Sequence, residues 1–320
     1  MRRFILITVG FFLIFSFTDC KSQMTLPSSS ATKGKIEEDA QKKGIKLPYR
    51  PWHLADIWWY FPKETQHFKR LDIDVTLDRD IPESFELYVA PIGLVSLNDI
   101  RSYGGLQTNI GGWPSKQSQK VVRPGKGGIF SRWSTKEGEP IGLEYVDMPE
   151  GALCESNGYE GEFCSVRRPY KWKAGTYTFS LIKEETITFK NTPHTWISLN
   201  ITSLADQSKF KIGRLLFEGN DFTLWDEHAA FVEIYGDDSD IPELKITFGL
   251  PRLNGEKAEC KTALAVRPTD GLAGAPNCAI VTTKNENIIV EIAPVIQTEE
   301  FLQKRLYLYE WKFWRIYPKI

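Results

Sequence analysis

A chain of 320 residues with 42% hydrophobic residues can bury one large core or two modest ones. Its formal net charge of −1 excludes the strongly basic surface that nucleic-acid binding needs, so we expect no nucleic-acid partner. Aromatic residues make up 13% of the chain and include ten tryptophans, a composition that favours β-strands and suits contact with carbohydrate.

The N-terminus has the features of an export signal. Arg2 and Arg3 are followed by an apolar run from Phe4 to Phe17, which is too short to span a bilayer. We predict that residues 1–19 form a signal peptide. The protein is then expected in the cell envelope or the extracellular space.

Cys20 follows this run at the position where a bacterial lipoprotein carries its acylated cysteine. The match is imperfect because Asp19 stands where a small residue is usual. We predict lipidation at Cys20, with simple secretion as the alternative, and contact with a membrane only through that anchor. The polar segment 20–47 is expected to be a flexible tether with at most one short helix, around residues 36–43.

The remaining cysteines predict disulfides, because an even number in an exported protein is typical of an oxidised framework. Four cysteines allow three connectivities. The short separations favour Cys154 with Cys164 and Cys260 with Cys278. Zinc is the alternative, but neither pair has Cys-x-x-Cys spacing and no histidine lies close to either in sequence, so we expect no metal and no cofactor.

From Pro48 onward the pattern predicts an all-β protein. Between Leu71 and Leu77 apolar residues alternate with aspartate and threonine, which indicates a strand with one solvent-facing side. The aspartates could also suggest a calcium site, but the glycine of an EF-hand loop is missing. Turn signals recur about every eight to twelve residues and no long segment shows a helical period, which favours an antiparallel β-sandwich or a β-barrel. We assign it residues 48–236, followed by a smaller β-rich extension or domain over 237–320.

A hairpin with two Gly-Gly pairs is the candidate site. One arm runs from Tyr103 to Trp113 and the other from Gly127 to Trp133, and glycine pairs in strands indicate that another group approaches the backbone closely. The candidate binding residues, on these arms and on a later strand-like run, are Tyr103, Gln107, Asn109, Trp113, Arg132, Trp133 and Trp172.

These residue types suit neutral sugars, since aromatic rings stack on sugar rings and amides bond to hydroxyls. Gln107 and Asn109 are two apart and would share one face of a regular strand. The plainer interpretation of Trp133 and Trp172 is that they belong to the core. The basic loop between the arms, with Lys116, Lys120, Arg123 and Lys126, is either an exposed loop or a contact for an acidic sugar or phosphate.

The hairpin resembles paired motifs of a secreted family catalogued as domain of unknown function 3472. Residues 103–109 are similar to its "GxQxN" strand and residues 128–133 to its "IFSxW" strand. Further likenesses follow in the family's order: Gly158–Gly161 to a "GGEG" turn, 169–177 to a "YPWxxGxTY" run and 230–233 to a closing "SFVE". The resemblance covers residues 50–236, implies an exported lectin-like sandwich without established chemistry, and adds Glu160 as a neighbour of the hairpin.

Glu160 and Glu162 support a second hypothesis, a retaining glycoside hydrolase. On a strand their Cα atoms would lie roughly 6.5–7 Å apart on one face, which suits the roughly 5–5.5 Å between the carboxyl groups of retaining enzymes. Gly158 and Gly161 favour a turn equally, and in a turn the carboxylates diverge. No Gly-x-Ser-x-Gly elbow accompanies the histidines, and we expect His228 in an exposed loop rather than in a metal site.

A third hypothesis is a surface lipoprotein whose aromatic C-terminal run, Leu306–Tyr317, docks a protein partner. Burial of that run against the sandwich is the plainer interpretation. Of the three hypotheses we favour an exported, non-catalytic, carbohydrate-binding module whose partner is a glycan or another surface ligand.

Overall fold

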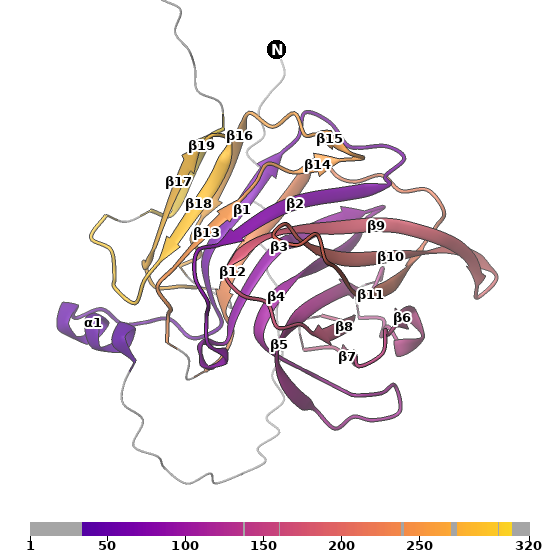
Figure 1. Cartoon of the computed structure of the whole chain (residues 1–320), viewed down its shortest axis with the longest axis horizontal. Coiled ribbons are helices and arrows are strands. Elements are labelled where there is room, and N and C mark those ends of the chain that lie inside the picture. The colour runs from indigo at the N-terminus through magenta and orange to yellow at the C-terminus, as the bar shows by residue number, and fades with distance from the viewer. Residues whose placement is uncertain are drawn as a thin grey trace, which may run out of the picture. The chain divides into compact units, whose positions relative to one another are not determined.

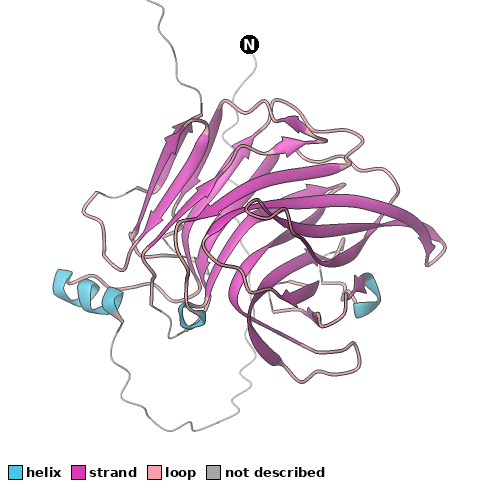
Figure 2. Cartoon of the chain, in the orientation of Figure 1, coloured by secondary structure: helices cyan, strands magenta, loops and turns pink. Residues whose placement is uncertain are grey.

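The computed structural model describes residues 34–136, 138–159, 161–237, 240–269, 274–299 and 301–308. Within them the chain forms two large antiparallel sheets that pack face to face, with only short helices (Figures 1 and 2). This confirms the predicted β-sandwich. The predicted signal peptide, Cys20 and most of the aromatic C-terminal run lie outside the described residues.

One sheet has nine strands, and most of the predicted binding residues belong to it. In spatial order the strands are β19 (Gln303–Tyr307), β16 (Thr262–Val266), β1 (Trp52–Tyr60), β12 (Glu227–Ile234), β3 (Leu87–Leu97), β4 (Ile100–Gly112), β5 (Val122–Trp133), β8 (Phe163–Pro169) and β7 (Leu153–Asn157). The predicted hairpin therefore corresponds to β4 and β5, which lie between β3 and β8 in this sheet.

The other sheet has ten strands. Its main path is β17 (Ala279–Lys284), β18 (Asn287–Ile292), β13 (Leu244–Phe248), β2 (Arg70–Leu77), β9 (Gly175–Phe189), β10 (Thr192–Ser203), β11 (Lys209–Glu218) and β6 (Val146–Asp147). Two short strands lie beside this path, β14 (Arg252–Leu253) against β2 and β15 (Glu256–Lys257) against β14.

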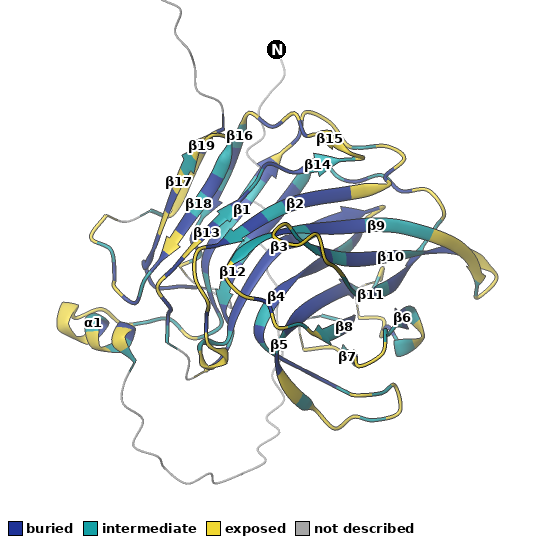
Figure 3. Cartoon of the chain, viewed as in Figure 1, coloured by how far each residue is buried: buried dark blue, intermediate teal, exposed yellow. Residues whose placement is uncertain are grey.

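Strand β2 shows how the sequence pattern directs the packing. Leu71, Ile73 and Val75 are fully buried and belong to the main core, whereas Asp74 and Thr76 are half-buried on the opposite face. Because side chains alternate across a strand, the predicted period of two places one row in the core between the sheets and the other row outside. Figure 3 shows the buried residues concentrated along the middle of the strands.

The C-terminal strands extend both sheets. Ala265 of β16 is paired with Ile57 of β1 in the nine-stranded sheet, and Ile246 of β13 with Leu77 of β2 in the ten-stranded sheet. The buried residues of these strands join the same core cluster as those of the preceding strands. The predicted β-rich extension is thus a continuation of the sandwich.

Three short helices complete the described chain: α1 (Lys35–Lys43) and two 3₁₀ turns, η1 (Glu83–Phe85) and η2 (Leu143–Tyr145). Helix α1 ends at Gly44, whose φ of 67° favours glycine. Its Ile36 and Ala40 are buried in the main core cluster, so this part of the predicted tether is packed against the sandwich.

Candidate functional site

The glycine pairs of the β4–β5 hairpin allow the two sheets to approach closely. A Cβ atom added at Gly104 would lie 2.3 Å from Cδ2 of Leu199 on β10, and one at Gly128 would lie 2.6 Å from Cδ1 of Ile212 on β11. Both distances are far inside van der Waals contact. The close approach that the glycines predict is real at these two positions, and the approaching group is the opposite sheet.

Arg132 lies inside the sandwich, which corrects the prediction that it lines a binding face. Its side chain is fully buried, and both Nη atoms donate to the Glu218 carboxylate of β11, at 2.9 and 3.2 Å. Nη1 also donates to the carbonyl of Leu216. Since neighbours on a strand face opposite ways, Trp133 lies on the outer face of the nine-stranded sheet.

That outer face carries a second hydrophobic cluster, separate from the main core. We call it the aromatic face; it consists of Tyr88, Ala90, Tyr103 and Ile129, with Trp133, Phe231 and Tyr235 packed against them. The ring centroids of Tyr103 and Trp133 are 4.8 Å apart, and those of Tyr88 and Phe231 are 5.1 Å apart with the rings edge to face. Trp133 is half-buried, so part of its ring is open to solvent.

Gln107 belongs to this face, since it is paired directly with Tyr88 and is half-buried. Asn109 lies at the edge of the cluster, where the Tyr235 hydroxyl donates to its carbonyl at 2.8 Å. The register shifts between Gln107 and Ile110, so the regular alternation that predicts one shared face for the two amides is interrupted there. Neither side-chain amide makes a hydrogen bond to another described residue.

Polar groups lie beneath and beside the aromatic rings. Ser131 and Ser165 are paired with each other across β5 and β8, Ser131 is also paired with Tyr103, and both serines are fully buried. Their hydroxyls make no hydrogen bond to any described residue. Such unpaired hydroxyls are unusual, because buried polar groups are ordinarily hydrogen-bonded.

An ion pair that the sequence analysis missed borders the serines. Glu155 of β7 and Arg167 of β8 are in contact, each with a side chain 12% exposed. Burial alone would lower the pKa of Arg167, but the charge of Glu155 and a hydrogen bond with Tyr159 raise it above its ordinary value. No local pattern links the two residues, and only the β7–β8 register, with Glu155 opposite Ser165, brings them together.

The two glutamates of the hydrolase hypothesis lie in the connection between β7 and β8. Glu160 is outside the described residues, and Glu162 falls after Gly161, whose φ of 81° turns the chain. The extended geometry that would aim both carboxylates to one face is therefore interrupted at Gly161.

Trp172 and Trp113 belong to the main core. Trp172 is 2% exposed, its Nε1 donates to the carbonyl of Gln107 at 3.1 Å, and Nζ of Lys126 lies 4.3 Å from its ring centroid. Trp113 packs partly buried against the core, with its backbone bonded to Cys154. Trp172 is therefore a core residue, which is its plainer interpretation, and Trp113 packs against the main core and not against the aromatic face.

The four cysteines in the described chain are buried free thiols, so the predicted disulfides are wrong. Cys154 is paired with Val166, and Cys164 with Ser156, which offsets the two cysteines diagonally on adjacent strands. Diagonal neighbours lie about 7–8 Å apart at Cα, beyond the usual disulfide range of about 4.4–6.8 Å. Burial raises the pKa of Cys164 and of Cys278 to about 12 each.

His228 is in strand β12 and fully buried, not in an exposed loop as expected. Its ring stacks on Trp59 at a centroid distance of 5.4 Å. Burial lowers its pKa to about 4, so the imidazole is neutral at physiological pH. Among the described residues no group of three His, Cys, Asp or Glu side chains is arranged to hold a metal.

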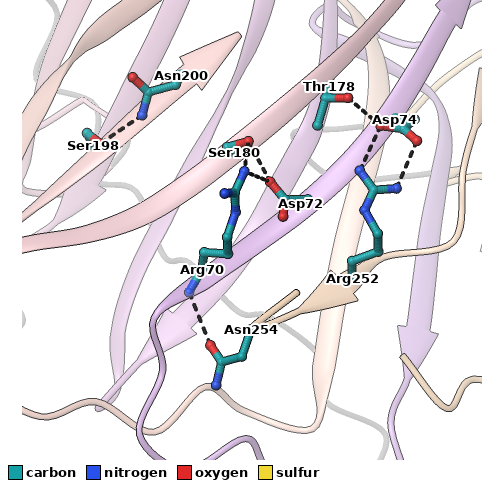
Figure 4. A network of polar contacts seen from close by, with 9 residues as sticks. All are labelled: Arg70, Asp72, Asp74, Thr178, Ser180, Ser198, Asn200, Arg252 and Asn254. Atoms are coloured by element: carbon teal, nitrogen blue, oxygen red, sulfur yellow. Dashed lines mark hydrogen bonds and ion pairs between the residues drawn. The ribbon is translucent and has the colours of Figure 1, made fainter. Parts of the chain in front are cut away.

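The outer face of the ten-stranded sheet has a different character, which Figure 4 shows. We call it the polar face; it consists of Asp72, Asp74, Thr76, Thr176, Thr178, Ser180, Asn200 and Arg252. Arg252 binds Asp74 through two hydrogen bonds, of 2.8 and 2.9 Å, and Arg70 donates to Asp72 at 2.7 Å. The alternation of apolar and polar residues around Asp72 and Asp74 correctly predicts a polar outer face. The same pattern does not indicate that Arg70 and Arg252 bind these two aspartates.

No family model and no curated protein matches the chain. The resemblance of the hairpin to the secreted family therefore stays a prediction. No helix in the described part of the chain has the length and apolar character needed to cross a membrane.

Proposed function

We propose that the protein is a non-catalytic carbohydrate-binding module and that it binds glycan on the aromatic face. The observation that carries the proposal is the second cluster of aromatic rings, on the outer side of a sheet whose inner side already forms the core. An outer sheet face is ordinarily polar, so an apolar cluster there calls for an explanation. Tyr88, Ala90, Tyr103 and Ile129 are themselves buried, and the apolar surface offered to a ligand is that of the half-buried residues packed against them, Trp133, Phe231 and Tyr235.

The groups around the cluster suit a sugar. Trp133 offers a partly open ring for stacking, and Gln107 offers an amide with unused donors and acceptor beside Tyr88. A few placed polar groups within an apolar surface are typical of ligand sites that discriminate by hydrogen bonding.

Binding is favoured over hydrolysis because the carboxylate pair of the hydrolase hypothesis falls at a turn. Export, predicted from the N-terminus, would bring this face into contact with glycans of the envelope or its surroundings. Lipidation at Cys20 would hold the module at a membrane surface.

A glycan array tests the proposal with single substitutions. We expect Trp133→Ala and Gln107→Ala each to lower retention at least about tenfold, because each removes a stacking surface or a bidentate amide. Asn200→Ala is the matched control, since Asn200 is an equally half-buried amide on the opposite sheet and bonds only to Ser198. Retention that survives both test variants, with folded protein by circular dichroism, would show that glycan is not bound here.

A further inference from the structure

A groove of about 370 Å³ lies on the outer face of the ten-stranded sheet, across the sandwich from the aromatic face. Asp74, Thr76, Thr176, Thr247 and Arg252 line it, and the buried Leu250 adds an apolar contact. Its volume is within the range of small-molecule sites, roughly 300–1,000 Å³. No sequence motif singles out this groove.

The charged side chains of the groove are held in fixed positions. Nη1 and Nη2 of Arg252 donate to the two carboxylate oxygens of Asp74, and Thr178 donates to Oδ1 of Asp74 at 2.6 Å (Figure 4). Partial burial would raise the pKa of Asp74, but these hydrogen bonds and the charge of Arg252 lower it below its ordinary value. Both side chains remain 33% exposed, so a ligand can reach them.

These side chains keep hydrogen-bonding capacity for a ligand. A guanidinium has five N–H donors, and those of Arg252 that do not bond to Asp74 make no hydrogen bond to a described residue. Thr76 and Thr176 bond to each other at 2.8 Å, which leaves one hydroxyl hydrogen of the pair free. Thr247 is paired with Thr76, so three threonines form a row across the groove.

The charges of the groove are balanced. Its acidic residues, Asp74 and Glu286, are each in an ion pair with one of its basic residues, Arg252 and Lys257. A balanced, oriented set of donors and acceptors favours a neutral polyhydroxylated ligand over an anion, which would have to compete with the carboxylates for the arginine.

We propose that this groove is a second ligand site, which binds the hydroxyl groups of a neutral saccharide. The threonine row and the free donors of Arg252 contact those hydroxyls, and Leu250 contacts the apolar side of the ring. This proposal does not rest on the aromatic face, because the two sites share no residue.

The test uses saturation-transfer NMR with maltose, lactose, cellobiose and N,N′-diacetylchitobiose as probes. The parent is a Trp133→Ala, Gln107→Ala variant, which removes the proposed aromatic-face site. We expect at least one probe to bind this parent. Adding Thr76→Val and Thr176→Val should weaken that binding about tenfold, since two hydroxyls are lost while shape and strand preference are kept.

Thr202→Val is the matched control, because Thr202 is paired with Thr178 on the same face of the sheet but does not line the groove. It should change binding less than twofold. If the double valine variant does not fold, Asn287→Ala at the groove's rim replaces it, with weaker binding expected. Probes that bind wild type but not the parent would overturn the groove proposal alone. Probes that bind neither protein would overturn the groove proposal and would also count against the aromatic face.

Discussion

The two outer faces of the sandwich follow the same alternating pattern and differ in how their side chains are held. On the aromatic face rings pack on rings, and the Glu155–Arg167 pair beside them is 12% exposed at each partner. On the polar face the Asp74–Arg252 pair is 33% exposed, and its neighbours are hydroxyls. The aromatic face therefore contributes more to stability, while the polar face mainly orients hydrogen-bonding groups.

Removing one carboxylate from each face should give the largest difference in stability loss between the aromatic face and the polar face. Glu155→Gln leaves Arg167 buried without its counter-ion, and we expect a loss of about 3 kcal/mol in the free energy of unfolding. Asp74→Asn removes a more exposed charge and should cost less than about 1 kcal/mol. Urea unfolding of both variants measures the difference, and equal losses would contradict the distinction between the faces.

An effect of similar size is expected when an isoleucine is truncated on each face. Ile129 of the aromatic face is 2% exposed, so Ile129→Ala should cost about 2–4 kcal/mol through lost burial and a cavity. Ile289 is half-buried on the outer face of the ten-stranded sheet, where Ile289→Ala should cost less than about 1 kcal/mol. The thermal unfolding midpoints of the two variants measure the difference. A larger fall in midpoint for Ile289→Ala than for Ile129→Ala would contradict the conclusion that the aromatic face contributes more to stability.

Local pattern was enough to predict the strands and their wet faces. The alternation from Leu71 to Leu77 predicts both the buried row and the polar face of β2, and the Gly-Gly pairs predict a close approach at β4 and β5. These properties depend on residues near in sequence, because side-chain direction in a strand is set by the local backbone.

The composition of each site was not predictable from local pattern. Arg132 is predicted on a binding face, but its side chain lies inside the sandwich, where it binds Leu216 and Glu218 of β11. Which of two neighbouring strand residues faces inward depends on this packing and not on the local sequence. Arg252 meets Asp74 from 178 residues away, and Glu155 meets Arg167 only in the β7–β8 register. Pairing of this kind arises from the tertiary fold, which a single sequence does not display.

The smallest expected effect is a difference in pH dependence between an acid on each sheet. The folded-state pKa of Asp74 is lowered, so its contribution to stability is present above the unfolded value of about 3.9 and is lost as the pH falls through the folded value. Burial, together with Asp226, raises the pKa of Glu227 on β12, so ionising Glu227 costs stability as the pH rises above about 4.3.

Asp74→Asn and Glu227→Gln should therefore have opposite effects on the stability profile between pH 3 and pH 7. The deficit of Asp74→Asn relative to wild type should shrink toward pH 3, because below about 3.9 the unfolded state takes up a proton before the folded carboxylate does. Glu227→Gln should gain on wild type toward pH 7, because it removes the cost of a half-buried charge. Chemical denaturation at a series of pH values measures the stability difference between each variant and wild type. If that difference changed with pH in the same direction for both variants, burial would outweigh the Arg252 hydrogen bonds at Asp74.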